Sequence, residues 1–141
     1  MSVYIIATLK VLYATVVGAL IGYERERKGK PAGIKTHSLV CLSACIVTLV
    51  GIMTFKDTNI GDPMRLPAQV ISGIGFIGAG VIMNKNNVIF GLTSAAGLWL
   101  AGCMGVVIGS DYTFISIPAI IAYILISRVF PIIEDKMKRE Q

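Results

Sequence analysis

The polar residues best placed to do chemistry form one segment, from Glu24 to His37, between two long apolar stretches. If a helix continues into this segment, Glu24 pairs with Lys28 and Glu26 with Lys30, both in the favourable i,i+4 order. Two interpretations stay open. The segment is either a salt-bridged turn at the level of the lipid headgroups, or a docking surface for a phosphate, an anionic lipid or a partner protein.

The second half of this segment carries residues that end a helix and turn the chain. Gly29, Pro31 and Gly33 predict that the first helix stops here. Thr36 or Ser38 is then expected to cap the helix that follows.

His37, Cys41 and Cys45 are spaced four residues apart and would share one face of a helix. A zinc site needs a fourth ligand, and Cys103 is remote in sequence. We therefore interpret the cysteines as buried thiols beneath a histidine at the membrane interface. Because no nucleophile, base and metal set can be assembled, we expect no metal site, no cofactor and no enzymatic activity.

Glycines are dense in the stretch after Pro67. Gly73, Gly75 and Gly78 match the dinucleotide-binding pattern G-x-G-x-x-G, but neither the preceding strand nor the later acidic residue of that motif is present. A closely packed or locally unwound helix, running on to Gly80, is the better interpretation. Gln69 and Ser72 would then supply hydrogen bonds to neighbours.

The elements that position these residues are apolar. Of the 141 residues, 55% are hydrophobic and 15% are charged, and the mean hydropathy is +0.75, which is too apolar for a soluble domain. Five stretches, residues 3–23, 38–55, 67–83, 88–109 and 112–133, are long enough to cross a bilayer once each. We expect an all-α, polytopic membrane bundle of five transmembrane helices forming a single domain over residues 1–141, with the first helix retained and no soluble domain appended.

The basic residues test this segmentation. The net charge of +5 lies in short loops, so a nucleic-acid partner is not expected. With five spans, ten of the thirteen Lys and Arg residues fall on one side. The positive-inside rule places the N-terminus outside and the C-terminus in the cytoplasm, with Asn84 to Asn87 as a tight cytoplasmic turn.

Two stripes of small residues predict close helix packing. The first stripe is Ala14, Gly18 and Gly22, and the second is Gly97, Ala101, Gly105 and Gly109. The partner of each stripe is either another helix of the chain or a second copy. Because a chain this small encloses little by itself, we expect a homo-oligomer in contact with membrane lipids.

Lys10 is the ionisable residue well inside a span. It either snorkels outward to meet Asp57 or Asp111, or belongs to a conduction path. No Asp or Glu lies in the middle of a span, and this disfavours a monomeric pump or a carboxylate-lined magnesium conduit.

Three blocks of sequence resemble the MgtC/SapB family of bacterial membrane proteins. They are residues 18–26 continued by 29–37, residues 68–80, and residues 91–96 followed by Trp99. The resemblance implies a multi-pass protein of the cytoplasmic (inner) membrane, linked to growth at low magnesium and, in pathogens, to virulence. It also marks these candidate residues for function: Lys10, Glu24, Arg25, Glu26, Lys30, Pro31, Gly33, Thr36, His37, Arg65, Gln69, Ser72, Gly73, Gly75, Gly78, Gly80, Gly91, Thr93 and Trp99.

Two functions remain in competition. The first is a regulator that contacts another membrane protein, favoured because the strongest polar pattern lies at the cytoplasmic interface. The alternative is an oligomeric transporter or channel for magnesium or another small ion, lined by Gln69, Ser72, Thr93 and Ser94 with glycine carbonyls.

Overall fold

The computed structural model describes residues 2–85 and 87–139. Its helices are α1 (Ser2–Arg27), α2 (Ile34–Thr58), α3 (Arg65–Ala79), α4 (Leu92–Gly109) and α5 (Ser116–Arg139). A short hairpin, β1 (Met83–Lys85) and β2 (Val88–Phe90), joins α3 to α4, and a 3-10 turn, η1 (Thr113–Ile115), precedes α5. The expected all-α class is confirmed.

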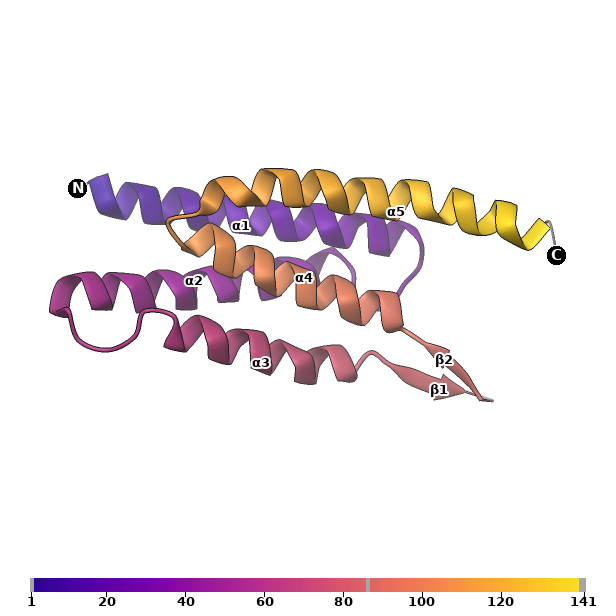
Figure 1. Cartoon of the computed structure of the whole chain (residues 1–141), viewed down its shortest axis with the longest axis horizontal. Coiled ribbons are helices and arrows are strands. Elements are labelled where there is room, and N and C mark those ends of the chain that lie inside the picture. Colours follow the sequence, from indigo (N-terminus) through magenta and orange to yellow (C-terminus); the bar gives the residue numbers. More distant parts are fainter. Residues whose placement is uncertain (1, 86, 140–141) are drawn as a thin grey trace.

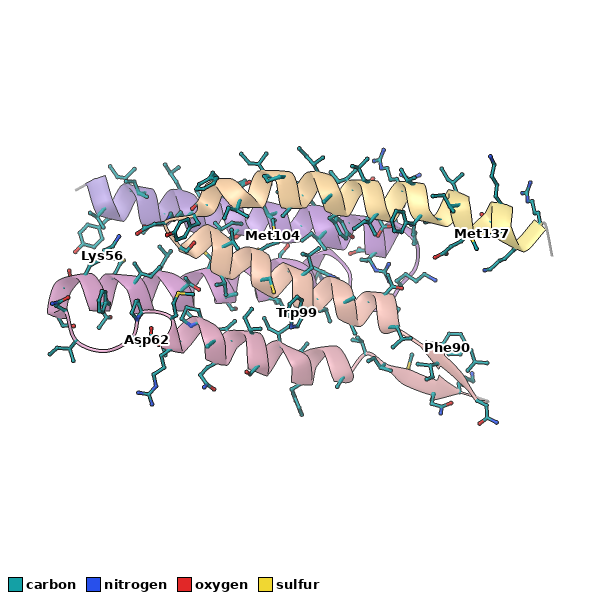
Figure 2. The ribbon with its side chains drawn as sticks, viewed as in Figure 1. Lys56, Asp62, Phe90, Trp99, Met104 and Met137 are labelled. Carbon is teal, nitrogen blue, oxygen red and sulfur yellow. The ribbon has the colours of Figure 1, made fainter. Side chains whose placement is uncertain are left out.

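The helices run alternately up and down the bundle (Figure 1). The turn between α1 and α2, the β-hairpin and the end of α5 share one end, which we call the hairpin end. The start of α1 and the links from α2 to α3 and from α4 to α5 share the opposite end. Figure 2 shows the same division, with Phe90 and Met137 at the hairpin end and Lys56 and Asp62 at the other.

Among the described residues, four helical segments are long and apolar enough to cross a membrane: Val3–Arg27, Ile34–Thr58, Leu92–Gly109 and Thr113–Arg139. Helix α3 has 15 residues, which span about 22 Å at 1.5 Å per residue. It is therefore shorter than a hydrocarbon core of about 30 Å.

The expected stretches 67–83 and 88–109 differ from the observed helices. Helix α3 ends at Ala79, and Val88–Phe90 form a strand instead of the first turn of α4. The two strands pair antiparallel, with Met83 opposite Phe90. A polar turn followed by β-branched and aromatic residues favours a hairpin over a helix. Of the expected turn at residues 84–87, Asn84 and Lys85 belong to β1 and Asn87 lies in the turn before β2, while Asn86 falls outside the described residues.

Helix α2 lies at the centre, where it packs against α1 and α4. Both small-residue stripes face it. A Cβ atom added at Gly18 would lie 2.6 Å from the carbonyl oxygen of His37, and one at Gly105 would lie 2.6 Å from the Cβ of Ala44. The stripes therefore serve packing inside the chain, and of the two partners that the sequence left open, the structure shows another helix of the same chain.

The same packing forms the core. Its fully or almost fully buried members come from α1, α2 and α4, namely Ala14, Val17, Ile21, Cys41, Cys45, Ala101, Met104 and Ile108. Large apolar side chains on the outer faces remain exposed, as in helices surrounded by lipid. The polar residues discussed next lie where this core reaches the hairpin end.

Candidate functional site

Helix α1 ends in a glycine motif that fixes the polar segment at the hairpin end. Gly29 has φ of 61°, and its N–H donates to the carbonyl of Glu26 at 3.0 Å. The N–H of Lys30 donates to the carbonyl of Arg25, also at 3.0 Å. This pair of bonds is a Schellman motif, which needs the left-handed conformation that glycine adopts readily. The predicted helix stop is confirmed.

Glu26 caps the next helix. Its Oε2 accepts the backbone N–H of Ile34 at 2.8 Å, directly after Gly33, the N-cap residue. Thr36 and Ser38 lie inside α2, so the prediction that one of them caps this helix is wrong. Glu26 is not paired with Lys30 in the described part of the chain, because its carboxylate is used by the N-terminus of α2.

Glu24 and Lys28 form the predicted i,i+4 ion pair. The pair also ties α1 to α5, because the Tyr123 hydroxyl donates to Glu24 at 3.3 Å and to the carbonyl of Ile21 at 3.0 Å. Lys28 in turn donates to the carbonyl of Ser127 at 3.0 Å. These contacts thus tie the end of α1 to the middle of α5.

Arg25 points inward, toward α4. Its side chain is 8% exposed, its Nη2 donates to the Ser94 hydroxyl at 2.8 Å, and its Nη1 lies 3.9 Å from Glu24. Its Nε is buried without a hydrogen-bond partner among the described residues. A buried guanidinium normally satisfies its donors, so Arg25, with one hydrogen bond to Ser94, is under-used for a side chain of five N–H groups.

His37 is fully buried beside this cluster. Its Nδ1 lies 2.9 Å from the carbonyl oxygen of Gly33, and a Cβ at Gly97 would lie 3.2 Å from its Nε2. Gly97 therefore makes room for the imidazole ring. Cys41 and Cys45 lie in the core behind it. In residues 2–85 and 87–139, no three His, Cys, Asp or Glu side chains are close enough to share a metal ion.

A groove of about 750 Å³ opens between α4 and α5 next to Arg25. Its polar lining comes from Glu24, Arg25, Lys28, Lys30, Thr93, Tyr123, Ser127 and Glu134. Its apolar lining comes from Ala96, Gly97, Leu100, Ala119, Ala122, Ile126, Phe130 and Pro131. We call it the Arg25 groove.

The candidates of α3 lie elsewhere. Gln69, Ser72 and Gly73 share its exposed outer face, whereas Gly78 faces Ala95 of α4. Arg65 begins α3 at the opposite end. The structure thus separates Gln69 and Ser72 from Thr93, which lines the Arg25 groove, and from Ser94, which is buried against Arg25.

The remaining family candidates lie outside the Arg25 groove. Gly91 precedes α4 with φ of 90°, and an added Cβ would collide with the backbone of Val81. Gly75 has open space around it, and Gly80 caps the end of α3. Trp99 is half exposed on α4, and Pro31 is exposed in the turn.

Lys10 makes its contacts at the opposite end. Its ammonium donates to the carbonyls of Gly109 and Ser110, at the C-terminus of α4. There a positive charge complements the helix dipole. Asp111 instead pairs with Lys56 at 2.9 Å, and this hydrogen bond holds the pKa of the Asp111 carboxyl below its usual value. The expected snorkelling to an aspartate is therefore replaced by capping of α4.

Sequence reasoning missed Tyr123 and Ser127, which complete the site from α5. Both lie within a stretch interpreted only as an apolar span. A tyrosine there was a signal, because a buried hydroxyl needs a partner. The partner itself, the end of α1, is set by helix arrangement and not by local sequence.

Comparisons with known proteins identify the family. The chain matches the MgtC family over residues 11–136. It is 46% identical to protein SapB of Bacillus subtilis over 110 residues, 74% of this chain and 47% of that protein. It is 37% identical to an Escherichia coli K12 protein named "Putative magnesium transporter YhiD" over 127 residues, 86% of this chain and 59% of that protein. It is 43% identical to protein MgtC of Salmonella typhimurium over 101 residues, 72% of this chain and 42% of that protein.

These relatives are longer, and the chain spans about half the length of each one that it matches. No solved structure matches the chain significantly. The family match covers all of α2, α3 and α4, most of α1 and α5, and every residue of the Arg25 groove. Together with four helices apolar enough to span a bilayer, it shows that the chain is a membrane protein that belongs to the MgtC family.

Proposed function

We propose that the chain is a protein of the bacterial cytoplasmic membrane that adapts the cell to low magnesium by contacting and regulating another membrane protein. One observation carries the proposal. The ordered polar cluster of Glu24, Arg25 and Lys28 lies at one end of the bundle, next to the exposed Lys30 and Pro31. Such a rigid, charged end supports recognition of a partner at the membrane surface. The names of the relatives MgtC and YhiD support the link to magnesium.

The proposal includes a topology of five spans with the hairpin end in the cytoplasm. Ten of the thirteen Lys and Arg residues belong to that end or to the half of α5 that leads to it. Helix α3 would cross as a short fifth span, continued by residues 80–82. Single-cysteine labelling in a background without native cysteines tests this topology. Labelling of Lys30→Cys from inside and of Asn59→Cys from outside is expected, and the reverse pattern would refute it.

A growth assay tests the regulatory function. Arg25→Ala is a poor probe, because it removes a buried side chain that holds Ser94. Lys30→Ala is a better one, since Lys30 is exposed. We expect it to abolish the effect of the protein on growth at low magnesium, while Lys35→Ala, an exposed lysine at the start of α2, leaves that effect unchanged. Equal activity of both variants would refute the contact at this end.

We also propose that two copies associate through the outer face of α3. Gln69 and Ser72 lie exposed on this helix, and a hydrogen-bonding side chain that faces lipid is stabilised by a polar partner. Nothing lies within 4 Å of a Cβ added at Gly73, so a second helix has room to approach there. Disulfide crosslinking of Ser72→Cys in native membranes is expected. The control Leu125→Cys, on α5, is expected to stay uncrosslinked, and crosslinking of both alike would refute this interface.

A transporter is the second candidate, favoured by the same polar face of α3 and by the name of the relative YhiD. Purified protein in liposomes distinguishes the two functions. The regulator predicts no magnesium flux. A saturable flux that is lost in Gln69→Leu and kept in Lys30→Ala would establish the transporter instead.

A further inference from the structure

We propose that the Arg25 groove binds one anionic phospholipid, with its phosphate beside Arg25, Lys28 and Lys30 and its acyl chains between α4 and α5. The proposal requires only that the bundle lies in a membrane. It goes beyond the regulatory contact and does not depend on it.

The unused donor of Arg25 is the first argument. This side chain lines the groove and is 8% exposed, and among the described residues its five N–H donors make one hydrogen bond, from Nη2 to Ser94. A phosphate oxygen is the acceptor that a guanidinium prefers, because the planar donors match its geometry. Lys28 and Lys30 line the same rim and add two further positive charges.

Two carboxylates also line the groove, and neither cancels the positive charge of its rim. Glu24 is already paired with Lys28 and accepts the Tyr123 hydroxyl. Glu134 is exposed near the end of α5. With three basic and two acidic side chains, the lining keeps a positive charge, which favours an anionic over a zwitterionic headgroup.

The direction of the groove identifies a lipid as its occupant. Its charged residues belong to the end of α1, the turn after it and the last part of α5, at the hairpin end, whereas Leu100 lies halfway along α4 and Ala119 and Ala122 lie in the first half of α5. Polarity therefore falls along the helix axes, from the membrane surface toward the bilayer centre. A phospholipid has the same gradient, with a phosphate at the surface and hydrocarbon below it. A free phosphate would leave the apolar part of the groove unused.

Native mass spectrometry of the detergent-purified protein tests the proposal. The probes are phosphatidylglycerol, phosphatidylcholine with the same acyl chains, and glycerol 3-phosphate as the soluble headgroup. We expect one phosphatidylglycerol to bind at least tenfold more tightly than phosphatidylcholine, and no binding of glycerol 3-phosphate at the same concentration. Equal retention of the two lipids would show an unselective lipid annulus and overturn the proposal. Binding of glycerol 3-phosphate as tight as that of the lipid would assign a phosphate site instead and would also overturn it.

Two pairs of variants locate the site. Lys30→Gln is expected to weaken phosphatidylglycerol binding about fivefold, the loss expected for one lysine near an anionic headgroup. Its control Lys35→Gln lies outside the groove and is expected to bind as wild type. Ala122→Phe, which fills the groove from α5, is expected to weaken binding at least tenfold, whereas Leu125→Phe, on α5 but not in the groove lining, is expected to have no effect.

These exposed positions keep the test independent of folding, since none of the four side chains is buried. Unchanged binding in both Lys30→Gln and Ala122→Phe would overturn the proposal. The growth assay for the regulatory function has a separate readout. Ala122→Phe thus separates the two ideas, because loss of lipid binding with normal growth would support the lipid site and dissociate it from regulation.

Discussion

Replacing Gly105 by alanine tests the packing of α4 on α2, which holds the centre of the bundle. The added Cβ would lie 2.6 Å from the Cβ of Ala44 and closer still to the carbonyl oxygen of Cys41. Carbon atoms pack best at about 3.5–4.0 Å, so the gap must open by about 1 Å. Neither contact ends on a flexible side chain, so α2 and α4 must move apart.

The magnitude follows from two opposing effects. Overpacking of this kind costs about 1–3 kcal/mol. Alanine is favoured over glycine inside a helix by about 0.8–1.0 kcal/mol. Gly75→Ala in α3 is the matched control, because nothing lies within 4 Å of its added Cβ. The two variants share the helix-propensity gain, so the difference between them isolates the overpacking cost.

Unfolding in mixed micelles, with SDS as the denaturant and circular dichroism as the readout, measures this difference. We expect Gly105→Ala to lower the free energy of unfolding relative to Gly75→Ala by about 1–3 kcal/mol. Equal stability of the two variants would refute the close approach of α4 to α2. Greater damage from Gly75→Ala would show that α3 is packed where the structure leaves it open.

Three further measurements address single contacts. Tyr123→Phe removes the hydroxyl that donates to Glu24 and is expected to lower the free energy of unfolding by about 0.5–1.5 kcal/mol. It should also speed amide hydrogen exchange at the end of α1. Protection of these amides equal to wild type would contradict the contact between α1 and α5. Lys10→Met, assayed in the same micelles, is expected to cost about 1.5–3 kcal/mol by uncapping α4. A stable but inactive Lys10→Met would indicate a conduction role instead. Lys56 lowers the pKa of Asp111, so their ion pair stabilises the fold fully at pH values above 3.8, the ordinary pKa of an aspartate, and this stabilisation is lost as pH falls through the lowered pKa. Because the pair is exposed, the expected loss of unfolding free energy in an acid titration is below about 1 kcal/mol. Asp111→Asn should abolish this pH-dependent loss.

Local sequence predicted what depends on local chemistry. The all-α class followed from apolar lengths, and the end of α1 followed from Gly29, Pro31 and Gly33. The ion pair of Glu24 with Lys28 followed from helical spacing alone. These features need no knowledge of which helices become neighbours.

Other features depended on that knowledge. The stripes containing Gly18 and Gly105 were visible in the sequence, but their common partner, α2, became clear only from the arrangement of the helices. Arg25 appeared to be a surface residue of a charged loop, yet its place on the inner side of α1 turns it toward Ser94. The hairpin was missed because its apolar strand continues the hydrophobic run of α4 without a break in composition.

The central place of α2 has a consequence for how the chain enters the membrane. Helix α4 begins 34 residues after α2 ends, which at about 5–20 residues per second corresponds to roughly 2–7 s of synthesis. During this interval the face of α2 that packs on α4 lacks its final neighbour. Its two buried polar side chains tolerate the delay, because His37 bonds to the carbonyl of Gly33 and Thr48 to that of Ala44, both within α2 or its cap. Helix α2 can thus stay in the bilayer with these two bonds already made, before α4 packs against the same face.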